Sequence, residues 1–220
     1  MSPLKPLCLA LLALALPRFA PAQTVITAYA VPAGTFADQF IPNPLGLDFD
    51  VLSTICVLSL GVFDSGQDGL AFSHVLRIYD RTTELSIATV TVPAGTAATL
   101  AGGSRFVDLA TPLVLTAGFH GTIVAEINPT DGNGNTNGGP AISMLNTGGG
   151  ALTFVGGGRV SDTGPGTYPA RLDGGPVNRY LAGTFTFVNG LAAVPEPGTN
   201  LLLAVGVVVL IFCHRRKRAP

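Results

Sequence analysis

The stretch His74–Asp80, HVLRIYD, is a short β-rich run in which the apolar Leu76 and Ile78 flank the charged Arg77. Successive side chains of a β-strand point to opposite faces of the sheet, so this period of two predicts a strand. Leu76 and Ile78 favour burying the face that they share, with polar residues at both ends of it. The two faces would carry His74, Leu76, Ile78 and Asp80 on one side, and Val75, Arg77 and Tyr79 on the other.

Short runs of similar character recur along the chain between Gly, Pro, Asn and Asp residues, and no long stretch shows the 3.6-residue period of a helix. Many short strands at this spacing favour one antiparallel β-sandwich, because a parallel sheet would need intervening helices. Jelly-roll-like and immunoglobulin-like topologies both stay open. In the last run, Leu181, Gly183, Phe185 and Phe187 share a face. The runs cover residues 24–31, 47–51, 55–63, 74–80, 85–92, 106–115, 121–127, 152–154 and 180–188.

The segment 128–176 differs from the rest because glycine is dense in it, including three glycines at 148–150 and three more at 156–158. Glycine raises the entropy cost of ordering the backbone, so this segment is expected to form long loops with only brief strands. Long loops carry binding surfaces more often than cores do. The segment is therefore the first place to look for a binding surface.

The first 22 residues have the organisation of a secretory signal peptide. Lys5 precedes an apolar stretch at residues 7–16, and Ala20-Pro21-Ala22 supplies the small-x-small cleavage pattern. We expect cleavage after Ala22, which leaves a single domain at residues 23–193. That domain has six arginines, no lysine and twelve acidic residues, so it offers no positive field for nucleic acid. It keeps one cysteine, Cys56, which is expected to be a small buried hydrophobe.

The last 27 residues, 194–220, read in three parts. Pro195-Glu196-Pro197 cannot continue a helix or strand, because proline fixes φ and lacks a backbone donor. An uncharged apolar run at 201–213 can enter a bilayer as a helix. It spans about 20 Å against a hydrocarbon core of about 30 Å, which suits a temporary anchor. The basic tail at 214–218 is held in the cytoplasm by the positive-inside rule; its charges are Arg215, Arg216, Lys217 and Arg218.

This tail resembles the PEP-CTERM sorting signal of exported bacterial proteins, in which a Pro-Glu-Pro motif, a short transmembrane helix and an Arg-rich end follow in order. The resemblance implies recognition by an exosortase, with cleavage near Pro195–Pro197. It also implies a host that makes exopolysaccharide and places such proteins at the cell surface or in the extracellular matrix. The chain before Pro195 would then lie outside the cytoplasmic membrane.

Part of the domain also resembles an uncharacterised module found in proteins with the same tail. The matching features are a Leu-Gly-x-x-Phe segment at 45–49, a Leu-Gly-x-Phe-Asp strand at 60–64 with an acidic Gly-rich turn, a Ser-His pair at 73–74, and the strand at 106–115. This module has no known activity. The resemblance therefore implies an exported sandwich domain and nothing about its ligand.

Carboxylates in turns are the candidates for a metal site. Asp64 and Asp68 bracket a short turn that could place oxygen ligands around calcium. The alternative is that they only form the turn, because Asp is common in turns without any bound metal. The segment 131–137 starts like an EF-hand loop, with Asp131 at its head, but lacks the central glycine and the closing glutamate. Asp48 and Asp50 are two apart, so on a strand both carboxylates point the same way.

Catalysis is not expected. His74 or His120 could be assigned with a serine to a catalytic triad, but the sequence lacks the Gly-x-Ser-x-Gly motif that holds the nucleophilic serine of such enzymes. The leading expectation is a structural or adhesive surface protein that an exosortase processes. One alternative is a carbohydrate-binding module for exopolysaccharide, although the absence of Trp and the scarcity of Tyr count against it. The other is a secreted hydrolase, which would need a pair of carboxylates on either side of the bound sugar.

Overall fold

The computed structural model describes residues 23–126, 128, 130–134, 144–174 and 182–192. The expected signal peptide, the Pro-Glu-Pro motif, the apolar run and the basic tail all lie outside these residues, and so does Leu181. Within the described part of the chain, no helix has the length and apolar character needed to cross a membrane.

The described residues form strands, with one 3-10 turn, η2, at Ser65–Gln67. The stretches predicted at 55–63 and 74–80 are strands with those same ends. The runs predicted at 47–51, 85–92, 106–115 and 121–127 agree with the observed strands to within two residues at each end, whereas the run at 24–31 contains two separate strands of two residues each. The strands are β1 (Ile26–Thr27), β2 (Tyr29–Ala30), β3 (Leu45–Val51), β4 (Ile55–Phe63), β5 (His74–Asp80), β6 (Ser86–Val92), β7 (Thr99–Ala101), β8 (Ser104–Leu115), β9 (His120–Glu126), β10 (Met144–Leu145), β11 (Leu152–Val160), β12 (Arg171–Leu172) and β13 (Gly183–Asn189).

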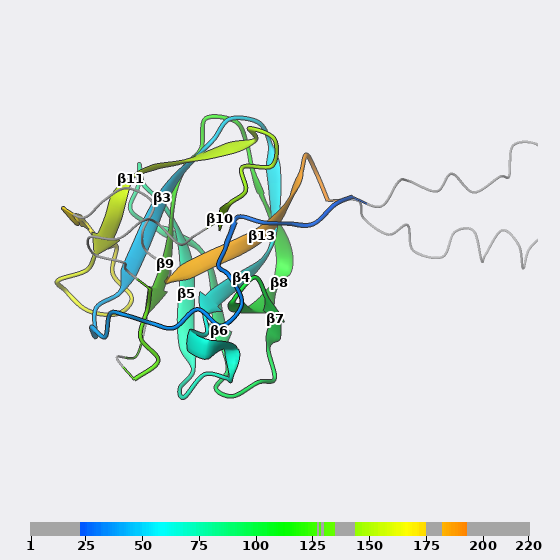
Figure 1. The fold of residues 1–220 in the computed structure, drawn as a ribbon. Helices are drawn as coiled ribbons and strands as arrows, with labels where there is room; N and C mark the ends of the chain where they lie inside the picture. Colours follow the sequence, from blue (N-terminus) through cyan, green and yellow to red (C-terminus); the bar gives the residue numbers. More distant parts are fainter. Residues whose placement is uncertain (1–22, 127, 129, 135–143, 175–181, 193–220) are drawn as a thin grey trace, which may run out of the picture. The chain divides into compact units, whose positions relative to one another are not determined.

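The strands are arranged in two main sheets (Figure 1). One has five strands in the order β1-β13-β4-β8-β7, and the other has six in the order β12-β11-β3-β9-β5-β6; β10 and β2 form a separate pair. Every pairing is antiparallel. The prediction of an all-β, antiparallel domain is confirmed, and the two sheets share one hydrophobic core as in a sandwich.

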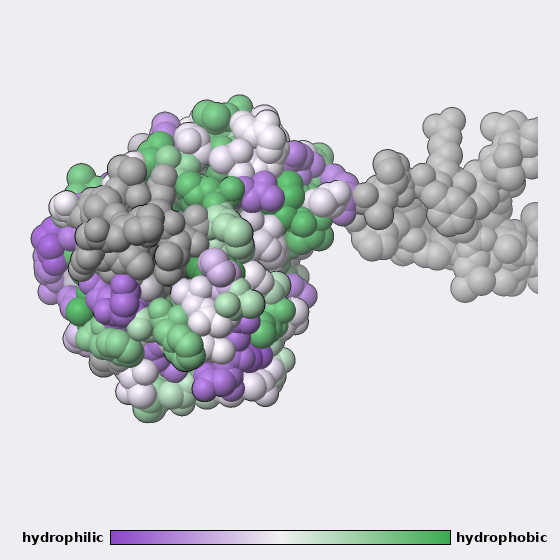
Figure 2. Space-filling model, viewed as in Figure 1, coloured by the Kyte–Doolittle hydropathy of each residue, from purple (hydrophilic) through white to green (hydrophobic). Residues whose placement is uncertain are grey.

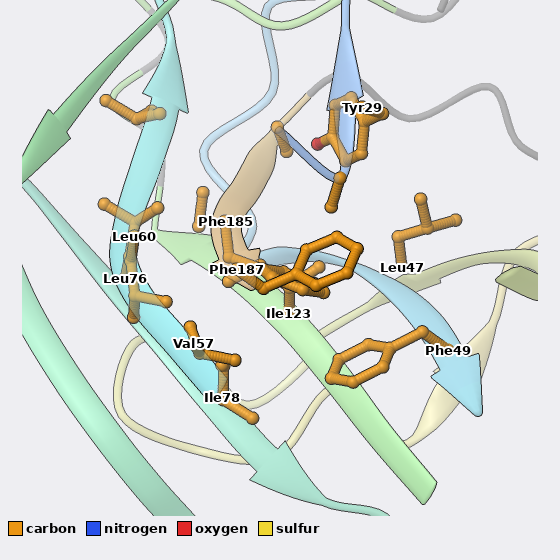
Figure 3. Packing of buried hydrophobic residues seen from close by; sticks show 14 of the residues in the cluster. Tyr29, Leu47, Phe49, Val57, Leu60, Leu76, Ile78, Ile123, Phe185 and Phe187 are labelled. Atoms are coloured by element: carbon orange, nitrogen blue, oxygen red, sulfur yellow. The ribbon is translucent and has the colours of Figure 1, made fainter. Parts of the chain in front are cut away.

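The core forms where the inner faces of the two sheets meet. The predicted inner face of β5 is confirmed, because Leu76 and Ile78 are fully buried and His74 lies beside them at 0% exposure. Figure 3 shows Phe185 and Phe187 of β13 among the aliphatic side chains of the opposing sheet. Phe185 lies 4.9 Å, ring centre to ring centre, from Phe49 of β3, so aromatic contacts join the two sheets.

The strand β11 is longer than the sequence predicts. It continues from Leu152 through the three glycines at 156–158 to Val160 and pairs with β3 along its length. The register shifts between Val155 and Gly158, and Gly156 has φ +72°, a backbone conformation that glycine adopts without strain. The glycines therefore form a bulge inside a strand, and the expected loop at this point is wrong.

Two buried side chains lie in or beside the five-stranded sheet. Cys56 is a free, buried thiol, which confirms its predicted role as a small core residue. The hydroxyl of Tyr29 donates to the carbonyl oxygen of Gly183, which joins β2 to the start of β13. Burial raises the pKa of Tyr29 far above its ordinary value, so its hydroxyl keeps the proton that it donates.

Candidate functional site

Asp64, one of the two predicted calcium ligands, lies inside the domain. It is 1% exposed, and its Oδ2 atom accepts a hydrogen bond of 2.7 Å from Nε of Arg105. The backbone N–H of Gly69 also donates to both carboxylate oxygens at 3.2 Å. A cation bound at Asp64 would lie beside the Arg105 guanidinium, so this geometry favours a structural ion pair; calcium binding through Asp64 stays a prediction.

Asp68, the other predicted ligand, faces a hollow of about 370 Å³ at the surface. We call it the Asp68 hollow. Asp131, the head of the EF-hand-like segment, lines the same hollow, so the fold brings together two candidates that the sequence separates by more than sixty residues. The hollow is lined by Phe40, Ser65, Asp68, Gly69, Leu70, Ala71, Gly95, Thr130 and Asp131.

Asp131, which lines the Asp68 hollow, is paired with the buried His74. Nε2 of His74 lies 2.6 Å from Oδ2 of Asp131. The carboxylate of Asp131 also accepts from the backbone N–H groups of Ala71 at 2.6 Å and Phe72 at 3.1 Å. The other ring nitrogen of His74 lies 3.3 Å from the carbonyl oxygen of Glu126. Both ring nitrogens of His74 are engaged in the structure, so the pair holds two loops together rather than presenting a free base.

One exposed phenylalanine lines the Asp68 hollow, and two more are next to residues of its lining. Phe40 lines it with 59% of its surface exposed, while Phe36 and Phe72 are 73% and 48% exposed. The ring of Phe36 lies over Gly66, next to Ser65 of the lining, and the backbone of Phe72 bonds to Asp131. On the face of the domain shown in Figure 2, hydrophobic and hydrophilic residues are interspersed. Exposed aromatic rings beside a carboxylate are a common feature of ligand-binding surfaces.

A second group of polar residues lies on the outer face of the six-stranded sheet. We call it the polar cluster; it comprises Asp48, Asp50, Arg81, His120 and Arg159. Asp48 and Asp50 both accept hydrogen bonds from Arg81, which confirms that they point the same way. Nε of Arg159 lies 2.7 Å and 2.8 Å from the two Asp48 oxygens. Nδ1 of His120 lies 2.7 Å from Asp50.

The polar cluster connects the sheet to the loop that follows β11. The guanidinium carbon of Arg159 lies 5.2 Å from the ring centre of Tyr168, and Tyr168 packs edge-on against Tyr79 at 5.6 Å. Burial raises the pKa of Tyr168 above its ordinary value. A hollow of about 390 Å³ lies here between Arg81, Thr82, His120 and Arg159. Because each arginine already faces a carboxylate, the cluster is best explained as the attachment of this loop.

The remaining predicted sites are outside the described residues or give no metal geometry. The sorting motif, the cleavage-site alanines and the basic tail fall in the first group. The part of 131–137 that the structure describes ends at 134, and Asp131 there is already bound by three donors. Among the described residues, no three or more His, Cys, Asp or Glu side chains are grouped so that they could hold a metal ion.

Comparison with known proteins finds no family model that matches the chain and no curated protein that matches it.

Proposed function

We propose that this chain is an exported protein of the cell surface or extracellular matrix, that an exosortase sorts and cleaves it, and that its β-domain has a structural or adhesive role. The observation that carries the proposal is the three-part tail, in which Pro195-Glu196-Pro197 precedes a short apolar run and a basic end. Residues 1–22 act as the signal peptide, and residues 201–213 are the temporary transmembrane helix. The domain between them is a single sandwich that stays outside.

The domain supports an adhesive role because its buried polar groups are already hydrogen-bonded or ion-paired within the fold. The buried carboxylates Asp48, Asp64 and Asp131 are each held by arginine, histidine or backbone donors. His74 is engaged at both ring nitrogens. These groups stabilise loops on a rigid pair of sheets, which is the arrangement in which a surface domain presents binding residues.

Replacing Pro195-Glu196-Pro197 with alanines should leave the protein uncleaved in the membrane fraction, because the exosortase would lose its recognition motif while the apolar run still anchors the chain. The measurement is cell fractionation with the mass of the product determined. The matched control replaces the next three residues, Gly198-Thr199-Asn200, and should be processed like the native chain. Normal release of the triple-alanine variant would rule out this processing.

A second candidate function is that of a carbohydrate-binding module for exopolysaccharide. The specific observation in its favour is the Asp68 hollow, where Phe40 is exposed and the carboxylate of Asp68 has no ion-pair partner among the described residues. The lack of Trp argues against sugar stacking in general, but phenylalanine rings provide the same apolar face.

A further inference from the structure

We propose that the Asp68 hollow binds a glycan through a sugar that carries a free amine, such as glucosamine. The inference deepens the adhesive role, and it rests on the proposed function for the place where the protein would meet such a glycan. The binding itself is a property of the domain and can be measured without export.

The charge of the hollow favours a cation. Among the residues that the structure describes, its lining contains two carboxylates, Asp68 and Asp131, and no lysine or arginine. Asp131 accepts three hydrogen bonds and is fixed in place. The exposed carboxylate of Asp68 makes no hydrogen bond or ion pair with the described residues, so an ammonium group can approach it directly. The same charges repel uronic acids and sulfated sugars.

The aromatic rim favours a sugar over a simple amine. Phe40 lines the hollow with more than half of its surface exposed, and a sugar ring can place its apolar C–H face on such a ring. An ammonium group close to the ring gains a further cation–π attraction. Phe36 and Phe72, both exposed nearby, extend the apolar surface along which adjacent sugars of a chain can lie.

Neutral polar groups complete the site. Oγ of Ser65 accepts a hydrogen bond of 2.8 Å from the backbone N–H of Ala37, which leaves its own proton free to donate. Thr130 is exposed on the opposite loop and offers a second hydroxyl. Hydroxyls from two loops beside a carboxylate and an aromatic ring match the mixed polar and apolar surface of a sugar.

The test is calorimetric titration of the full chain, purified in detergent, with a glucosamine hexamer, a neutral glucose hexamer and a galacturonate hexamer. The glucosamine hexamer should bind most tightly and the galacturonate hexamer should not bind. Asp68→Asn should weaken glucosamine binding by about tenfold or more, because the charge-assisted hydrogen bond between the carboxylate and the ammonium group is lost. Phe40→Ala should weaken binding of both the glucosamine and glucose hexamers.

Two matched controls test whether binding depends on this site or only on net charge and exposed apolar surface. Asp108→Asn removes an exposed carboxylate from β8 and changes the net charge by the same amount as Asp68→Asn. It should leave the affinity for the glucosamine hexamer within about twofold, because surface substitutions away from a site have small effects. Leu85→Ala removes an exposed apolar side chain outside the hollow and should likewise have little effect.

Three results would overturn the proposal. Equal weakening by Asp68→Asn and Asp108→Asn would reduce the binding to net charge, and equal affinity for glucose and glucosamine would remove the role of the amine. Binding that disappears with a calcium chelator would assign Asp68 to a metal instead. None of these results would affect normal export and cleavage of the chain, so failure here is distinguishable from failure of the proposed function.

Discussion

Replacing Asp64 with alanine should lower the free energy of unfolding by about 3–5 kcal/mol, the usual cost of removing one partner of a buried ion pair. Arg105 is 5% exposed, and its guanidinium would stay buried without the carboxylate that now lies 2.7 Å away. Its remaining hydrogen bonds, to the carbonyl oxygens of Gln67, Thr96 and Ala98, cannot neutralise its charge. Urea denaturation monitored by circular dichroism measures the difference.

The control for this prediction is Asp68→Asn, since Asp68 is exposed and unpaired among the described residues; it should change stability by less than about 0.5 kcal/mol. The same experiment with a calcium chelator separates the two roles considered for Asp64. An ion pair predicts no effect of the chelator on the native chain. A large chelator effect, together with a small effect of Asp64→Ala, would contradict the structural assignment.

Replacing Phe185 with alanine should cost about 3–5 kcal/mol of stability, the range seen when a buried aromatic side chain is removed from a core. Phe185 is fully buried between the sheets, and its ring centre lies 4.9 Å from Phe49 and 5.9 Å from Phe187 (Figure 3). The loss should appear as a lower denaturation midpoint with an unchanged slope.

Phe40→Ala is the matched control for the core substitution, because it removes the same side chain from an exposed position. It should leave stability within about 0.5 kcal/mol, as expected for a surface residue. If the two variants were equally destabilised, Phe185 would not occupy the centre of a core shared by the two sheets.

Local alternation was sufficient to predict several strands of this domain. The bounds of β4 and β5 follow directly from apolar runs that end at polar or turn residues, and the buried face of β5 follows from Leu76 and Ile78. The order of strands in the sheets could not be predicted in this way, because register depends on contacts between distant segments. The strand through Gly156–Gly158 was missed because glycine density indicates loops, whereas here one bulge absorbs the unusual backbone geometry.

The candidate site was only partly predictable for the same reason. That Asp48 and Asp50 point the same way follows from their spacing, but their arginine partners come from other strands. Nothing near Asp64 in the sequence indicates Arg105, which reaches it across the pairing of β4 with β8. Asp68 and Asp131 line the same hollow because two loops pack together, and no local sequence pattern predicts that packing.

Mass spectrometry of the protein recovered from its host's surface and matrix fraction tests the central claim most directly. The account predicts a chain that begins at Gln23 and ends near Pro195–Pro197, without the apolar run or the basic tail. A chain recovered from the cytosol with Met1 and Pro220 both present would contradict it.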